Sequence, residues 1–212
     1  MSGLALAQPL VFGTGTNAAG TRVGAAGADL HYNLGAGAAN VVTQNFPPVA
    51  FPIGPWINPN TAGVNSNWVS VTTNGANNLA PGTYTFTTTF NLTGYIIGAI
   101  NLTGRWATDN SGTMLLNGNL ISTSSSFTAF TTFNTSTAAF FNPGLNTLTF
   151  NVVNAGSTGN PMGLLVDNPL LTGVTKVPEI DPASAATPLV FLGIALALVV
   201  DRRRRLCCAP PH

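Results

Sequence analysis

The sequence predicts an all-β fold, an antiparallel β-sandwich, on the basis of three observations. Apolar and polar side chains alternate from Thr83 to Leu92 and again from Asn146 to Asn154, which is the period of a strand buried on one face. No long segment of the domain has the period of an amphipathic helix. The 23 glycines and 15 prolines supply many turns, which together with the abundant threonine favour short strands.

The remaining strands are predicted from short runs between turn signals. In chain order they are Leu30–Leu34, Trp68–Thr72, Ala99–Thr108, Met114–Ile121, Phe127–Asn134 and Met162–Leu171. The turns are marked by Pro81-Gly82, Asn110-Ser111-Gly112, Asn117-Gly118, Pro143-Gly144 and Gly156 to Pro161. A single helical turn is expected over Ser136–Phe141. From Gly13 to Asn67 the chain is rich in Gly, Pro and Asn, so we expect ordered loops laid over the sandwich there.

Only 6 % of the residues are charged, against about 25 % in an ordinary soluble domain. The net charge is +1, and four of the seven basic residues form one run, Arg202, Arg203, Arg204 and Arg205. The rest of the chain is slightly acidic, which excludes a protein that binds nucleic acid through a basic face. Because 45 % of the residues are hydrophobic, charge-driven disorder is excluded as well.

The formally charged residues between Leu30 and Thr175 are Arg105, Asp109 and Asp167. Acid–base and metal chemistry need clusters of such groups, so we predict no catalytic residue and no metal site. Polar interactions must come from Thr, Asn and Ser, and the expected surface is neutral and hydrogen-bonding. The two cysteines, Cys207 and Cys208, are adjacent and follow the arginines, so they form no disulfide framework.

The C-terminal segment predicts a membrane span. Ala183–Val200 contains no charged residue and would be about 27 Å long as a helix, close to the roughly 30 Å of a bilayer core. Asp201 and the arginine run follow, and the positive-inside rule places them in the cytoplasm. We therefore expect a transmembrane helix over 187–200 and a cytoplasmic tail over 201–212. A buried core helix is the alternative, but an all-round apolar sequence favours the membrane.

The residues before this span carry a family resemblance. Val177, Pro178, Glu179, Ile180, Asp181 and Pro182 read VPEIDP and precede the span and the arginine run. This order resembles the PEP-CTERM sorting signal of bacterial exported proteins, although Ile180 stands where that signal has its second proline. The resemblance covers residues 177–205. It implies processing near the Pro-Glu pair by an exosortase, transient anchoring in the inner membrane, and a final location outside the cell or on its surface.

The middle of the chain carries a second resemblance. The strings Arg105-Trp106-Ala107-Thr108-Asp109-Asn110, Leu115-Leu116-Asn117-Gly118 and Gly144-Leu145-Asn146-Thr147-Leu148 occur in the order of the galactose-binding-like jelly rolls, which include non-catalytic sugar-binding domains. Asp29-Leu30-His31-Tyr32 is similar to an element of ectodomains joined to PEP-CTERM tails. The resemblance spans residues 28–173. It implies a jelly-roll β-sandwich and a sugar as the kind of ligand.

The expected domain organisation follows from these segments. Ala5 and Ala7 are spaced as in a signal-peptidase site, so residues 1–7 are interpreted as the remnant of a signal peptide, with an ordinary frayed terminus as the alternative. Residues 8–173 form the predicted ectodomain. It is loop-rich over 8–67 and has its core over 68–173, and residues 174–186 link it to the membrane span.

Three tryptophans are candidate sugar-binding residues, because a flat apolar ring stacks on the face of a pyranose. Trp106 and Trp68 lie in predicted strands, where a core position is the expected alternative. Trp56 lies in a proline-rich loop and is the best candidate for exposure, with a packed loop anchor as the alternative.

Polar residues complete the candidate ligand-binding set. Asp109 and Asn110 start a turn, and Arg105 is expected to pair with Asp109 across it. No cofactor is predicted. A structural calcium ion is the weaker alternative, since Asp109-Asn110 and Asp167-Asn168 carry oxygen ligands.

The function expected from the sequence is that of a non-catalytic protein associated with carbohydrate or exopolysaccharide. His31 is the one histidine of the domain and is expected to be structural. A glycoside-processing enzyme is the rival hypothesis, and it needs two carboxylates about 5–10 Å apart. Asp109 and Asp167 would have to supply them. The third hypothesis is a purely structural surface protein without a ligand.

Overall fold

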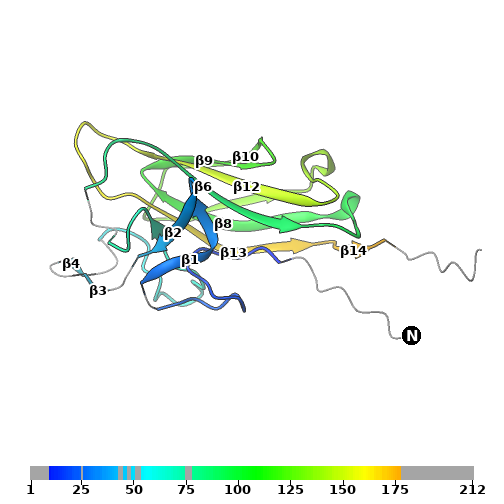
Figure 1. Cartoon of the computed structure of the whole chain (residues 1–212), viewed down its shortest axis with the longest axis horizontal. Coiled ribbons are helices and arrows are strands. Elements are labelled where there is room, and N and C mark those ends of the chain that lie inside the picture. The colour runs from blue at the N-terminus through cyan, green and yellow to red at the C-terminus, as the bar shows by residue number, and fades with distance from the viewer. Residues whose placement is uncertain are drawn as a thin grey trace, which may run out of the picture. The chain divides into compact units, whose positions relative to one another are not determined.

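The computed structural model describes residues 10–24, 26–42, 45–46, 49–50, 54–74 and 78–177. The chain divides into two compact units, Met1–Lys176 and Val177–His212, and all the described residues but one belong to the first. This unit is built of antiparallel strands, which confirms the all-β prediction (Figure 1). No helix in the described ranges has the length and apolar character of a membrane span. The predicted span 187–200 and the arginine run lie outside those ranges.

Ten strands of the described chain form one sheet, in the order β10-β9-β12-β6-β1-β2-β5-β13-β8-β11. Their bounds are β1 Gly27–Leu34, β2 Gly37–Val41, β5 Val69–Ser70, β6 Gly82–Asn91, β8 Asn101–Asp109, β9 Ser111–Leu116, β10 Asn119–Ser124, β11 Thr131–Thr135, β12 Leu145–Asn154 and β13 Gly163–Thr172. The small pairs are β3 Asn45–Phe46 with β4 Val49–Ala50, and β7 Tyr95–Ile96 with β14 Thr175–Lys176. Two 3-10 turns, η1 Ile97–Ala99 and η2 Ala138–Phe140, complete the elements.

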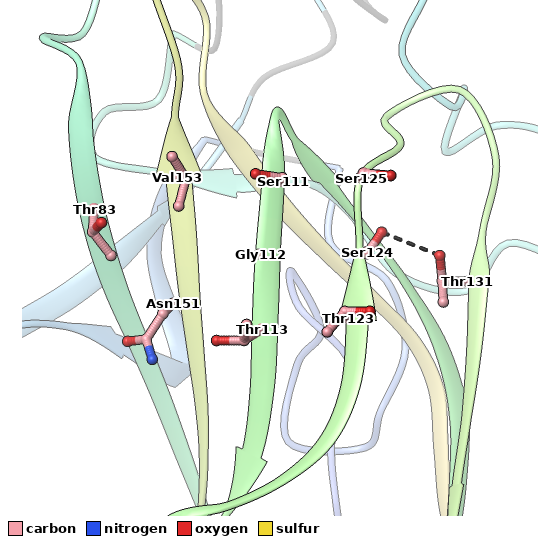
Figure 2. Close-up of a pocket in the computed structure, with 10 residues that line it drawn as sticks. All are labelled: Thr83, Ser111, Gly112, Thr113, Thr123, Ser124, Ser125, Thr131, Asn151 and Val153. Carbon is pink, nitrogen blue, oxygen red and sulfur yellow. Dashed lines mark hydrogen bonds between the residues drawn. The ribbon is translucent and has the colours of Figure 1, made fainter.

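The sheet curls until its two edge strands approach each other. β6, β9, β10 and β12 form one wall, and β8 and β13 form the other (Figure 1). The edges β10 and β11 share no backbone ladder, and Thr131 Oγ1 donates a hydrogen bond of 3.2 Å to Ser124 Oγ between them (Figure 2). The result is a nearly closed wall around one apolar interior, with a seam between β10 and β11.

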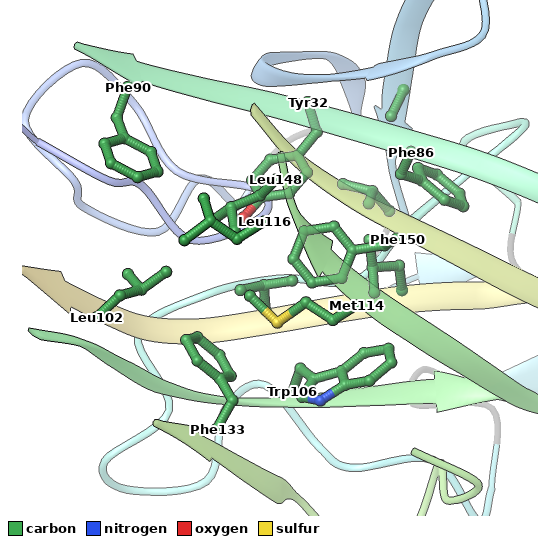
Figure 3. Close-up of a cluster of buried hydrophobic side chains, with 14 of the residues drawn as sticks. Tyr32, Phe86, Phe90, Leu102, Trp106, Met114, Leu116, Phe133, Leu148 and Phe150 are labelled. Atoms are coloured by element: carbon green, nitrogen blue, oxygen red, sulfur yellow. The ribbon is translucent and has the colours of Figure 1, made fainter. Parts of the chain in front are cut away.

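The main core lies inside this wall and follows from strict alternation along β6 and β12. These strands pair over ten residues without a bulge, and Phe86 lies opposite Phe150. Both rings are fully buried. The Phe150 ring meets Trp106 edge-on at 5.6 Å between centroids and Tyr32 at 5.9 Å (Figure 3). Burial of large aromatic side chains from both walls is the dominant favourable term that holds the walls together.

Two predicted boundaries differ from the structure for identifiable reasons. The strand predicted over Met114–Ile121 is a hairpin, because Asn117 and Gly118 both adopt positive φ, as a tight two-residue turn requires. The strand predicted over Phe127–Asn134 begins only at Thr131, since the residues before it leave the sheet to pack on its outer side. The helical turn expected over Ser136–Phe141 is present as η2.

Within residues 13–67, where loops were expected, the chain contributes two strands to the sheet. β1 and β2 lie between β6 and β5 in the middle of the sheet, and Tyr32, Ala39 and Val41 are part of the main core. β2 has the sequence GAANV, and Gly and Ala carry little strand propensity. Pairing with β1 on one side and β5 on the other overrides that weak preference.

Substitutions on the two faces of β12 test this arrangement. Phe150→Ala removes a fully buried ring and should lower the free energy of unfolding by about 3–5 kcal/mol in urea titrations. Val153→Ala, on the outward face of the same strand, should change it by less than about 0.5 kcal/mol. Equal losses at the two positions would contradict the assigned register.

Candidate functional site

The loop 54–68 covers the outer side of β8 and β13 and forms a second, smaller core. Its Trp56 is only 4 % exposed, and the Trp56 and Trp68 rings lie 4.3 Å apart between centroids. Ala107 of β8 and Leu165 of β13 lie beneath them. Gly163 leaves the necessary room, because a Cβ there would lie 2.7 Å from the Trp56 ring. Of the two alternatives for Trp56, the structure therefore shows the packed loop anchor.

The indole N–H groups of all three tryptophans are bonded within the protein. Trp56 Nε1 donates to Asp109 Oδ2 at 2.8 Å, and Trp68 Nε1 donates to the backbone carbonyl of Ile57 at 2.9 Å. Trp106 faces the main core and donates to Ser122 Oγ at 2.9 Å. All three rings are buried, so the structure shows the core or anchor alternative at each of these candidate positions.

The prediction that Arg105 pairs with Asp109 is also wrong. The register between β8 and β13 places Arg105 opposite Asp167, and Arg105 Nε and Nη2 donate to Asp167 Oδ2 at 2.8 and 2.6 Å. Asp109 lies four residues along β8, which is about 13 Å away. Asp167 is fully buried, and its charge needs this partner. The guanidinium also lies 4.2 Å from the centroid of the Phe130 ring and donates to the carbonyl of Gly63.

Asp109 and Asn110 form hydrogen bonds within the protein, to Trp56 and Ala155. Asp109 is 5 % exposed and its Oδ1 has no hydrogen-bond partner. Burial raises the pKa of the Asp109 carboxyl, and the hydrogen bond from Trp56 acts in the opposite direction. The side chain of Asn110 accepts a hydrogen bond of 2.8 Å from the backbone N–H of Ala155. Within the described ranges, no group of three His, Cys, Asp or Glu side chains is placed to hold a metal ion.

The Asp29–Tyr32 element organises the loop that precedes β1. Asp29 accepts hydrogen bonds from the backbone N–H groups of Gly15, His31 and Tyr32 at 2.6–2.8 Å. The His31 ring stacks on Phe12 at 3.8 Å between centroids. Burial, followed by the charge of Asp29, raises the pKa of Tyr32. The bond from Gly15 to Asp29 and the stacking of His31 on Phe12 hold the loop against β1, which is a structural role for His31.

A groove on the outer face of the other wall is the candidate functional site. It has a volume of about 560 Å³, and its lining residues lie on β6, β12, β9, β10 and β11 and in the segment after β10 (Figure 2). Its lining contains no charged and no aromatic side chain and is dominated by hydroxyl and amide groups. The lining residues are Thr83, Ser111, Gly112, Thr113, Thr123, Ser124, Ser125, Thr131, Asn151 and Val153.

The same alternation that builds the core directs the β6, β9 and β12 side chains of the groove outward, whereas Ser124 and Thr131, opposite Gly112 and Trp106, lie on the core side of the seam. Phe150 points inward from β12, so its neighbour Asn151 points outward. Asn151 lies directly opposite Thr113 of β9, and Thr113 lies opposite Thr123 of β10. Thr85 Oγ1 donates to Asn151 Oδ1 at 2.9 Å, which leaves the Asn151 amide nitrogen to donate into the groove. The groove thus offers both donors and acceptors at fixed positions.

None of the groove residues was a sequence-predicted site residue. The alternation from Thr83 to Leu92 places the threonines of β6 on one face, and this pattern predicts a polar outer face. The hollow itself depends on the seam, where Ser124 and Thr131 meet. That meeting follows from the curl of the whole sheet, which local sequence patterns do not encode.

The buried Asp109 carboxyl predicts a pH dependence of stability. A folded-state pKa above the unfolded value of 3.8 means that protonation stabilises the fold, and this contribution is lost as pH rises through the folded pKa. Relative to Asp109→Asn, the wild type should therefore lose free energy of unfolding between pH 4 and pH 7 in urea titrations. If the difference in free energy of unfolding between the wild type and Asp109→Asn does not change with pH, the raised pKa of Asp109 is contradicted.

Comparisons with protein families, with curated proteins and with solved structures found no match to this chain.

Proposed function

We propose that this domain binds an uncharged polysaccharide outside the cell and that it does so without catalysis. The observation that carries the proposal is the lining of the groove, in which hydroxyl and amide groups converge without any charge. Sugar hydroxyls donate and accept hydrogen bonds, and Ser, Thr and Asn side chains complement both roles. The volume of about 560 Å³ lies within the range of small-molecule sites.

The arrangement of the acidic residues supports a non-catalytic role. The backbone positions of Asp109 and Asp167 lie about 13 Å apart along the strands, whereas a glycoside hydrolase places its two carboxylates within about 10 Å. Asp109 is bonded to Trp56, and Asp167 is bonded to Arg105. Both carboxylates lie on the β8–β13 side of the domain and contribute nothing to the groove lining.

We further propose that the curled sheet is a jelly-roll ectodomain that is exported and then released from a membrane anchor. The compact unit ends at Lys176, directly before the VPEIDP motif, and Val177 is 53 % exposed. A processing signal needs such an accessible position after the last strand. In this proposal residues 187–200 cross the inner membrane, the arginine run stays in the cytoplasm, and an exosortase acts near Pro178-Glu179.

Retention on polysaccharides tests the binding function. The wild type should be retained on at least one neutral polysaccharide among dextran, xylan, mannan, cellulose and chitin. Between 50 and 500 mM NaCl the affinity should change by less than about twofold, because no charge is involved. Thr113→Val in the groove should weaken binding by about 2- to 10-fold. Thr89→Val, outside the groove on β6, should leave it unchanged. Absence of retention on every member would overturn the proposal.

Intact mass tests the processing. In a bacterial host that carries an exosortase, the exported protein should lack the mass of Arg202–Arg205 and of the preceding apolar span. The variant Glu179→Ala should accumulate at the uncleaved mass. An exported wild type whose mass still includes the arginine run would contradict the sorting interpretation.

A further inference from the structure

A continuous polar row crosses the groove at right angles to the strands. Asn151 of β12, Thr113 of β9 and Thr123 of β10 lie opposite one another in register, and Thr85 of β6 lies opposite Asn151. Figure 2 shows Asn151, Thr113 and Thr123 at one level of the groove. The three groove residues of this row lie on strands spaced about 4.8 Å apart and span roughly 10 Å. The row is therefore longer than one pyranose ring.

On β12 and β9, by contrast, the outward residue that follows the row is aliphatic. Val153 follows Asn151 on the outward face of β12 and is 37 % exposed. Leu115 follows Thr113 on β9, and Leu120 of β10, which is 57 % exposed, lies opposite Leu115. The row across β12, β9 and β10 therefore offers hydrogen bonds from three strands at one level, with Val153 on one side of it and Leu115 on the other.

From this pattern we infer that the groove binds an extended, uncharged glycan whose chain runs across the strands. The inference rests on the carbohydrate-binding function proposed above and specifies its ligand. A pyranose carries hydroxyls on its edge and C–H groups on its faces, so hydroxyls meet the polar row while C–H groups contact Val153. Because the groove is open to solvent, it accepts internal units of a chain.

Thr85 acts in this site as a positioning residue. It is not part of the groove lining, and its hydroxyl bonds the oxygen of the Asn151 amide at 2.9 Å. This bond fixes the amide plane, so that the nitrogen is presented to the chain. Loss of the Thr85 hydroxyl should therefore weaken glycan binding through Asn151, although Thr85 itself touches no sugar.

The direction of the chain is tested by affinity measurements with the full-length protein. The probes are cello-, manno- and isomalto-oligosaccharides, from the disaccharide to the octasaccharide. Affinity should rise with length until the row is filled. Thr123→Val should weaken binding about as much as Thr113→Val, by about 2- to 10-fold, and more than Ser111→Ala does. Thr89→Val is the control outside the groove, and unchanged melting temperatures establish that each variant is folded.

The opposite pattern would overturn the proposed direction. If Ser111→Ala matches Thr113→Val while Thr123→Val has no effect, the chain runs along β9. If binding responds to the groove variants but not to oligosaccharide length, the groove takes a terminal sugar, and the general function stands while this inference fails. If no oligosaccharide and no polysaccharide binds the wild type, both proposals fail.

A double-mutant cycle tests the positioning role. Thr85→Val should weaken binding by several-fold, and Thr85→Ser, which keeps the hydroxyl, should restore it. In the Asn151→Ala background, Thr85→Val should add no further loss, because its effect passes through the amide. Additive losses, or failure of Thr85→Ser to rescue, would overturn the role.

Discussion

The register between β6 and β12 is the constraint on which both the core and the groove depend. Ten consecutive pairs join the strands, so one choice of register places Phe86 and Phe150 inside and Thr85 and Asn151 outside. A shift by one residue would exchange the two sets and bury the hydroxyl groups. The apolar interior therefore fixes the binding face, and the positions of the outward groups are as well defined as the core beneath them.

Three charged residues, Arg105, Asp109 and Asp167, stabilise the opposite wall. Arg105 neutralises the buried Asp167, and Asp109 holds Trp56, so that loop 54–68 is fastened over β8 and β13. These groups are bonded within the protein and leave the groove without a formal charge. In the proposed function, hydrogen bonds and contact with Val153 select the ligand. The position of these charges, on one wall and away from the groove, explains why the groove is uncharged, which the composition alone does not.

The sequence predicted those elements whose signal is local. The strand from Thr83 to Leu92 agrees with β6 to within one residue at each end, because alternation is visible in the chain itself. The partner of Arg105 could not be predicted, since it depends on the register between β8 and β13, 62 residues apart. β2 carried no signal because its Gly and Ala residues take their conformation from the neighbouring strands. The burial of Trp56 depends likewise on Gly163, far along the chain.

The central claim is that the hydroxyl groove, and not the tryptophan-bearing face, contacts the polysaccharide. Amide and side-chain NMR of the isotope-labelled protein, titrated with a neutral oligosaccharide that it binds, tests this most directly. If the groove binds the oligosaccharide, signals shift at Thr113, Thr123 and the Asn151 side-chain amide, and the Trp56 and Trp68 indole signals stay unchanged. Shift changes confined to the two indoles and Arg105 would contradict the central claim.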